Sequence, residues 1–267
     1  MKEHQTLPKK ILAINGSHHG VKGHTHALLQ AISKGITAAR GEFEEVVLAG
    51  LKIQRCLGCG LCHTSDHSLH CVLEEKDDVA WVFNKMANAD LIIFATPIQV
   101  FGISSLLKTL LDRLYSTSDV NLFRVTRSGL FFHDIDERIC SKPFVSLISC
   151  DNLDAEMPLN VRHYFRQYAR FMDAPLVGEL IRNAGGIVCQ NNDPEILHKF
   201  PKIADVFSAY EESGRELVSM GRIRRSTQQR ANQEIIPVPF FGQLKRLSAF
   251  KHVMVEKAQG LLDFKVS

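Results

Sequence analysis

Residues 10–25 read KILAINGSHHGVKGHT, a short apolar run followed by a loop rich in glycine. The apolar run at residues 11–14 is bounded by a turn signal, which is typical of a buried parallel strand. A helical pattern begins at about His26. The glycines let backbone N–H groups approach an anion, and the helix start adds its own unpaired N–H groups and dipole. Thr25 is placed to cap that helix. The stretch therefore predicts either a phosphate-binding loop or an ordinary turn between strand and helix.

The spacing of glycines in this loop narrows the choice of ligand. The loop does not end in the Gly-Lys-Ser/Thr of a Walker motif. Its glycines at positions 16, 20 and 23 are also spaced more widely than in Gly-x-Gly-x-x-Gly. A mononucleotide phosphate held by hydroxyls and backbone amides therefore fits better than a dinucleotide.

Strand and helix patterns alternate along most of the chain. Strands are expected at 10–14, 44–49, 91–95, 143–149 and 175–181, and helices at about 26–39, 77–89, 106–114, 160–172 and 194–221. This alternation predicts an α/β fold, a doubly wound parallel sheet with helices on both faces. Ligands of such sheets bind at the carboxyl ends of the strands, so the loops after the first, third and fourth strands should form one site.

Composition excludes several classes of protein. The 267 residues are 45% hydrophobic and 23% charged, as in an ordinary globular protein. The net charge of +3 is too small to indicate a nucleic-acid partner. Residues 1–10 are polar and predict no signal peptide, and no apolar stretch approaches the length of a membrane span. We therefore expect a cytoplasmic protein with no nucleic-acid and no membrane partner.

Four of the seven cysteines crowd into a short segment, as Cys56-x-x-Cys59-x-x-Cys62 and then Cys71. Three closely spaced cysteines with a more distant fourth suit a four-iron cluster. A structural zinc would accept the same four sulfurs, or a mixture that includes histidine. The histidines nearby are His63, His67 and His70. Reduced thiols without a metal are the third reading of this segment.

A second candidate loop follows the strongest apolar run, Leu91 to Ala95. It spans residues 96–102 and combines a proline, a glycine and the aromatic Phe101. Such an irregular loop suits a flat ring ligand, because backbone groups can bond the ring edge while apolar side chains cover its face. The adjacent Asp112 and Arg113 are expected to form an ion pair at a helix end.

Three blocks in this order resemble the flavodoxin-like NAD(P)H-dependent FMN reductases. The first block is Asn15-Gly16-Ser17 through Gly23-His24-Thr25, which is similar to the phosphate loop of the family. The second is the cysteine segment followed by Asp77-Asp78, which resembles the compact motif of the iron–sulfur flavoprotein branch. The third is Ala95-Thr96-Pro97 through Leu111-Asp112-Arg113, which is similar to the flavin-ring loop and the helix after it. The resemblance implies a five-stranded flavodoxin-like sheet, bound FMN and a homodimer or homotetramer.

The resemblance assigns roles to individual residues. Ser17 and Thr25 would hold the FMN phosphate, which Gly16, His18, His19 and Gly23 would line. Pro97, Ile98, Gln99, Val100 and Gly102 would contact the ring or the ribityl chain. Cys56, Cys59, Cys62 and Cys71 would hold a 4Fe-4S cluster, with zinc as the alternative. Gln99 departs from the family, which usually has an aromatic residue there.

Three functions are compatible with these residues. The first is an oxidoreductase in which FMN takes a hydride from NAD(P)H and passes electrons to a small-molecule or protein acceptor such as a quinone or a flavin. The second is an iron–sulfur flavoprotein that carries electrons between protein partners. The third is a zinc-stabilised flavodoxin-like protein without a redox role.

The resemblance also suggests where the domain ends. Residues 1–221 would form the FMN-binding domain, with the cysteine motif in a loop at 50–76. Residues 222–267 would be a C-terminal extension that either contacts a neighbouring subunit or packs back on its own domain. The apolar piece at residues 235–241 contains Pro237 and Pro239, cannot form a helix and would be costly to expose.

Overall fold

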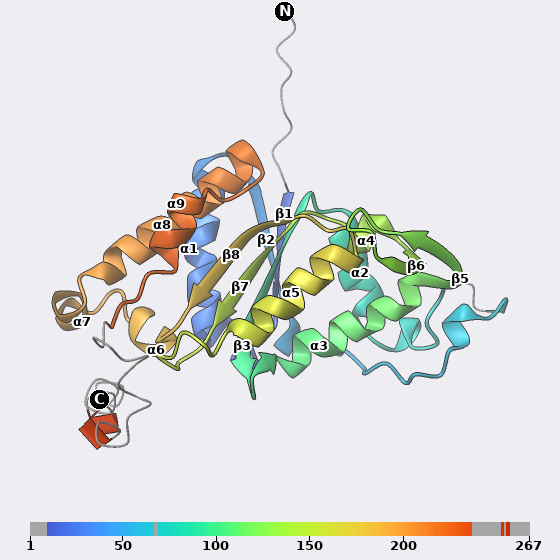
Figure 1. Ribbon diagram of the computed structural model, residues 1–267, viewed down its shortest axis with the longest axis horizontal. Helices are drawn as coiled ribbons and strands as arrows, with labels where there is room; N and C mark the ends of the chain where they lie inside the picture. Colours follow the sequence, from blue (N-terminus) through green and yellow to red (C-terminus); the bar gives the residue numbers. More distant parts are fainter. Residues whose placement is uncertain (1–9, 67–68, 237–251, 254, 257–267) are drawn as a thin grey trace, which may run out of the picture.

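A computed structural model describes residues 10–66, 69–236, 252–253 and 255–256 of the chain. Its centre is a parallel sheet with the strand order β2-β1-β3-β7-β8 (Figure 1). The five strands are β1 (Lys10–Asn15), β2 (Glu42–Val47), β3 (Leu91–Gln99), β7 (Phe144–Ser149) and β8 (Leu176–Arg182). The short β4 (Gly102–Ile103) folds back on the end of β3 in antiparallel pairing. The expected doubly wound, five-stranded parallel sheet is therefore confirmed.

Helices cover both faces of the sheet (Figure 1). One face is packed by α1 (His24–Ala38) and α8 (Lys202–Met220), whose apolar side chains share a core with those of β1, β3 and β7. The other face is packed by α2 (Val79–Ala87), α3 (Ser105–Asp112) and α5 (Leu159–Phe171). Helix α5 contributes the aromatic side chains of Phe165 and Tyr168 to that second core.

Helices α1 and α8 touch through their backbones. A Cβ atom added at Gly35 would lie 1.8 Å from the carbonyl oxygen of Glu211, and one added at Gly214 would lie 2.1 Å from that of Ile32. Real Cβ atoms do not approach that closely, so both positions require glycine. The contact fixes the position of α1 relative to α8, and it therefore also helps to position the loop that precedes α1.

A two-stranded hairpin occupies much of the segment at 116–142 that the sequence left unassigned. It consists of β5 (Ser118–Val125) and β6 (Phe131–Ile135), entered through the 3-10 turn η5 (Arg113–Thr117) and followed by α4 (Glu137–Cys140). Its outer face exposes apolar side chains, among them Val125 and Phe131 at 70% each. Phe123 and Phe131 stack on that face with ring centroids 4.8 Å apart.

The chain after α8 returns to the sheet. Helix α9 (Arg225–Ala231) lies beside α8, and its end covers the open edge of β8. Gln228 and Asn232 accept hydrogen bonds from the N–H groups of Glu179 and Ile181, at 2.8 and 2.7 Å. These side chains replace the neighbouring strand that the edge lacks, which closes it to pairing with another chain. Residues 222–236 thus contribute to the core, as buried Ala231, Ile235 and Ile236 show, and residues 237–241 lie outside the described chain.

The prediction of a single helix at 194–221 is wrong, because the helix is interrupted at Phe200 and Pro201. Helix α7 (Pro194–Lys199) ends one residue before Phe200, and α8 starts at Lys202. A residue before proline is disfavoured in helical conformation, which explains the break. The remaining short elements are η1 (Gly20–Lys22), η2 (Leu48–Gly50), η3 (Leu61–His63), η4 (Glu74–Lys76) and α6 (Gly185–Val188). No helix among the described residues is long and apolar enough to span a membrane.

Candidate functional site

The loop after β1 is held by a chain of hydrogen bonds that starts on β2. The half-buried carboxylate of Glu45 accepts from Asn15 Nδ2 at 2.8 Å and lies 2.9 Å from His26 Nδ1. Asn15 Oδ1 in turn accepts from the N–H of Ser17 at 2.9 Å. Glu45 therefore orients the Asn15 amide, and the amide fixes the backbone at Ser17. Sequence reasoning missed Glu45, because its partners lie 19 and 30 residues away along the chain.

The N-terminus of α1 is open toward this loop. Its N-cap is Gly23, and no side chain of the described residues caps the helix. The prediction that Thr25 caps α1 is wrong, because the helix starts at His24 and Thr25 lies in its first turn. Thr25 Oγ1 instead lies 3.0 Å from Ser149 Oγ at the end of β7. The first N–H groups of α1 are thus left for a ligand, and an anion suits them best.

Glycine is required where the loop closes around this helix end. A Cβ atom added at Gly23 would lie 2.6 Å from Ser17 Oγ. One added at Gly16 would lie 2.7 Å from Ser104 Oγ and 2.8 Å from Leu107 Cβ at the start of α3. Ser17 and Thr25 are both buried, whereas His18 and His19 are exposed. The cradle has the small residues, hydroxyls and free amides that a phosphate group needs, so the residues present fit one.

The second predicted loop lies beside the first. His18 Nε2 is 3.0 Å from Ser105 Oγ, and the N–H of Gly16 donates to the Ala95 carbonyl at 2.8 Å. The loop at 97–103 is a tight hairpin between β3 and β4, with Thr96 Oγ1 accepting from the N–H of Ser104 at 2.9 Å.

The tip of this hairpin is strained and exposed. Val100 and Phe101 have φ values of 43° and 66°, in the left-handed region that is costly for residues other than glycine. Their side chains are 92% and 62% exposed. The tip is held from below by Asn160 of α5, whose Nδ2 donates to the Phe101 carbonyl at 3.0 Å. Two apolar side chains are thus presented to the outside at the rim of the candidate site.

The loop after β7 completes the site, as predicted from the sheet. Asp151 Oδ1 accepts from the N–H of Gly186 at 2.7 Å and lies 3.5 Å from His24 Nδ1. Ser149, Asp151 and His24 therefore bring the end of β7 against the start of α1. The structure assembles the loops after β1, β3 and β7 at one edge of the sheet.

The four cysteines of the second motif line one small cavity of about 20 Å³. Cys62 is buried, Cys56 and Cys71 are half-buried, and Cys59 is exposed. Burial raises the pKa of the Cys62 thiol, and the negative charges of Cys71, Cys59 and Cys56 raise it further. Among the described residues, no three His, Cys, Asp or Glu side chains are arranged to hold a single metal ion. Four thiols around one cavity are the residue type and number that both an iron–sulfur cluster and a structural zinc use as ligands.

The histidines of this segment lie in different environments. His70 Nδ1 is hydrogen-bonded to Glu74 Oε2 at 2.9 Å. Both ring nitrogens of His63 are buried and find no hydrogen-bond partner among the residues that the structure describes, and the ring stands edge-on to Tyr115 at 4.4 Å between centroids. His67 lies outside the described residues.

A buried ion pair joins the two ends of the cysteine segment to the end of α3. Arg113 NH1 contacts Asp77 Oδ2 at 2.5 Å, and the two side chains are 2% and 0% exposed. The same NH1 donates to the Gln54 carbonyl, while Asp77 accepts from the N–H of Gln54 at 3.1 Å. The expected pairing of Asp112 with Arg113 is wrong, because Asp112 pairs with Lys108 one helical turn earlier. The partner of Arg113 is 36 residues away, too far for a local pattern to reveal.

Comparison with known proteins supports the resemblance that the sequence blocks indicate. Residues 9–127 match the family model described as NADPH-dependent FMN reductase. An iron–sulfur flavoprotein of Archaeoglobus fulgidus is 36% identical over 104 residues, which are 39% of this chain and 48% of that protein. An iron–sulfur flavoprotein of Methanocaldococcus jannaschii is 33% identical over 104 residues, 39% of this chain and 51% of that protein. The chain thus spans about half the length of the curated relatives it matches.

Solved structures show the same fold at low identity. An FMN-dependent NADH-azoreductase from Bacillus anthracis aligns with a TM-score of 0.55 and 12% identity, covering 80% of this chain and 100% of that one. An NAD(P)H:quinone oxidoreductase from Methanothermobacter marburgensis aligns with a TM-score of 0.54 and 15% identity, covering 79% and 100%. These neighbours establish a flavodoxin-like architecture.

The buried ion pair generates a stability prediction. Replacing Arg113 with Met should lower the free energy of unfolding by about 3–5 kcal/mol, because Asp77 would remain buried without its partner. Urea denaturation measures the effect. The matched control is Arg138→Met, which removes an arginine that is 80% exposed and paired with Asp136, and it should leave the free energy of unfolding nearly unchanged. Equal effects of the two substitutions would contradict the role of Arg113.

Proposed function

We propose that this chain is an FMN-binding, NAD(P)H-dependent oxidoreductase of the flavin or quinone reductase type, because residues 9–127 match the family model described as NADPH-dependent FMN reductase. One observation carries the proposal. The open N-terminus of α1 lies beside Ser17 and Thr25, at the edge where three strand-end loops meet. When bound, FMN would supply the hydride chemistry, and the protein would supply binding and orientation.

The loop after β1 would bind the phosphate. Ser17 and Thr25 would donate their hydroxyls, and the first N–H groups of α1 would point at the phosphate oxygens. Gly16 and Gly23 allow the close approach, and the exposed His18 and His19 flank the loop. Glu45 and Asn15 support this arrangement from below, since they hold the backbone at Ser17.

The hairpin between β3 and β4 would receive the ring and the ribityl chain. Its backbone groups at Pro97, Ile98 and Gln99 would reach the ring edge. Val100 and Gly102 would contact the ring or the ribityl chain from the end of the hairpin. The exposed apolar side chains of Val100 and Phe101 would keep water from the ring. The electron acceptor would be a small molecule or a protein that approaches from this side.

We expect the hydroxyls of the phosphate loop to dominate FMN affinity. Replacing both Ser17 and Thr25 with Ala removes two charge-assisted hydrogen bonds of about 1.5–3 kcal/mol each, so affinity should fall by roughly one to four decades. Fluorescence titration of the apoprotein with FMN measures it. The control is Ser219→Ala on α8, whose hydroxyl donates only to the Arg215 carbonyl. FMN affinity unchanged in the double variant would contradict the assignment.

The activity is tested by mixing the FMN-loaded protein with NADH or NADPH in the absence of oxygen. We expect one of the two to bleach the visible flavin absorbance at a rate that saturates with its concentration. The physical reason is that the hairpin would leave one face of the ring open to a nicotinamide. A flavin that is bleached by dithionite but by neither nucleotide would instead favour an electron carrier between protein partners.

We also propose that the four cysteines hold an iron–sulfur cluster. The proposal is supported by the donor set around one cavity and by the iron–sulfur flavoproteins among the relatives. Zinc is the alternative for the same sulfurs. Arg113 contributes to the wall of that cavity, and its Nε has an N–H that no described residue accepts, whereas its charge is already paired with Asp77.

Metal analysis decides between these centres. Protein purified without oxygen should contain iron and acid-labile sulfide in equal amounts, at about four of each per chain for a 4Fe-4S cluster. Cys62→Ser should remove most of both, whereas Cys140→Ser, at a buried thiol outside the segment, should retain them. Zinc in place of iron would support the structural alternative, and the absence of both metals would leave reduced thiols as the reading.

We propose a cytoplasmic homodimer or homotetramer for the assembled protein. The exposed tip at Val100 and Phe101 is one apolar surface that a second subunit could cover. The C-terminal extension proposed at residues 222–267 begins on its own domain, since Ala231 and Ile235 are buried in the core beside β8.

A further inference from the structure

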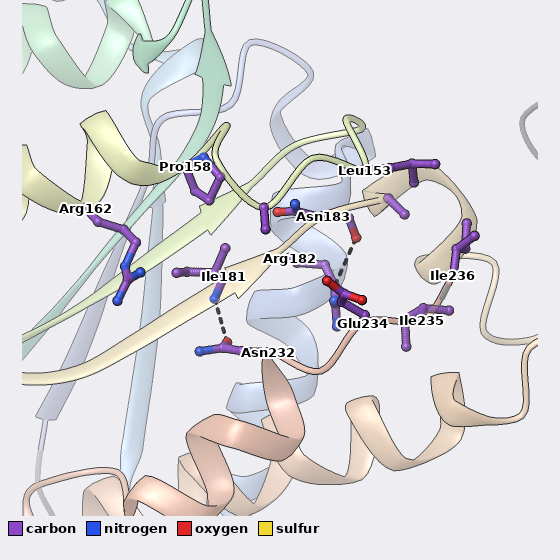
Figure 2. A pocket seen from close by; sticks show the side chains of 12 residues that line it. Leu153, Pro158, Arg162, Ile181, Arg182, Asn183, Asn232, Glu234, Ile235 and Ile236 are labelled. Carbon is purple, nitrogen blue, oxygen red and sulfur yellow. Dashed lines mark hydrogen bonds between the residues drawn. The ribbon is translucent and has the colours of Figure 1, made fainter. Parts of the chain in front are cut away.

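A second cavity, of about 210 Å³, lies at the carboxyl end of β8, the last strand of the sheet. One wall is the loop at residues 153–158 and the start of α5, and the opposite wall is the chain at residues 232–236 that follows α9 (Figure 2). The end of β8 passes between them and brings Ile181, Arg182 and Asn183 to the cavity. None of these residues belongs to the proposed phosphate or ring site.

Arg182 brings a buried positive charge to this cavity. Its side chain is 2% exposed and donates hydrogen bonds to three carbonyl oxygens, those of Asn183, Ala231 and Gln233, at 2.7–3.0 Å. In the part of the chain that the structure describes, no carboxylate forms an ion pair with it. Burial lowers the pKa of Arg182, which reflects the cost of a cation without a counterion.

Arg162 adds a second guanidinium from α5. Its NH2 lies 3.5 Å from Glu179 Oε2, but Arg166 already binds both oxygens of that carboxylate, at 3.1 and 2.8 Å. The Nε of Arg162 is buried and has no partner among the described residues. Two arginines therefore share one carboxylate, and Arg162 keeps a donor for another group.

The other polar groups of the cavity are occupied or exposed. Asn183 donates to the Asp154 carbonyl, and Asn232 bridges the backbones of Glu179 and Ile181. Arg162 and Arg166 face Glu179 on the side of α5, the exposed Glu234 lies at the rim, and Asp154 and Glu156 lie in the loop at residues 153–158.

The remaining lining is apolar and comes from both walls. It consists of Leu153, Ala155, Pro158, Ile181, Ala184, Ile235 and Ile236. Pro158 is also the N-cap of the 13-residue helix α5, whose dipole adds positive potential at this end. The volume is below the roughly 300–1,000 Å³ of sites for drug-sized ligands, so the occupant must be small.

We propose that this cavity binds a small organic carboxylate, with the carboxylate on Arg162 beside the charge of Arg182 and the apolar body against Pro158, Ile181 and Ile235. A guanidinium and a carboxylate match in shape and charge, which favours a carboxylate over a neutral group of equal size. The site is separate from the proposed flavin site and does not depend on it.

The probe for this proposal is benzoate, with benzamide as a neutral molecule of nearly the same shape. Calorimetric titration of the full-length protein should detect benzoate binding and a benzamide affinity about tenfold or more weaker, because only benzoate forms a charge-assisted bond. Arg162→Gln should weaken benzoate by about tenfold or more. Arg138→Gln, at an exposed arginine of α4, should leave benzoate binding unchanged.

A second variant tests the charge balance itself. Arg166→Gln should also weaken benzoate, because it releases Glu179 to pair with Arg162 while leaving Arg162 in place. Thermal melts of each variant verify that the protein is folded. Absence of benzoate binding to the wild-type protein, equal affinity for benzoate and benzamide, or full binding by folded Arg162→Gln would each overturn the proposal.

Discussion

The buried ion pair between Arg113 and Asp77 connects parts of the fold that no strand joins. Arg113 stands at the end of α3, the helix that follows the ring loop, and Asp77 stands just before α2. Together they hold both ends of the cysteine segment, since Gln54 is bonded to both side chains. Both ends of the cysteine segment are therefore attached to the end of α3. This gives the two proposed centres, the flavin loop and the cysteine cavity, a common mechanical support.

The parallel sheet imposes the second constraint. Because all five long strands run in one direction, their carboxyl ends meet at one edge, and the polar loops must gather there. The buried strands are mainly apolar, and their few polar side chains include Asn15 at the end of β1 and Ser149 at the end of β7. The loop after β1 therefore draws its support from a neighbour, through Glu45 on β2 and Asn15 at the end of β1. A precise anion cradle is obtained in this way from short loops that rest on a rigid sheet.

Sequence reasoning succeeded where the signal was local. The apolar runs at 11–14 and 91–95 are short, are bounded by turn signals and are typical of buried strands, and the order of the strands along the chain predicts the three loops. It failed where a role depends on a distant partner or on a shift of two residues. The partner of Arg113 lies 36 residues away, and Thr25 is no cap because α1 begins at His24 rather than at about His26. The β5–β6 hairpin gave no strong pattern because its outer face is exposed and apolar, so burial does not alternate along it.

The chain concentrates positive potential in two places by different physical means. At α1 the potential comes from peptide dipoles and from N–H groups at the start of the helix, which are part of the backbone and carry no net charge. At the end of β8 it comes from the guanidinium of Arg182, which burial deprives of water. Carbonyl oxygens of Asn183, Ala231 and Gln233 offset part of that cost and at the same time fasten the chain after α9 to the sheet. Arg182 thus attaches the chain after α9 to the end of β8 through neutral carbonyl groups. Because these groups do not neutralise its charge, the same residue also favours an anion in the proposed site.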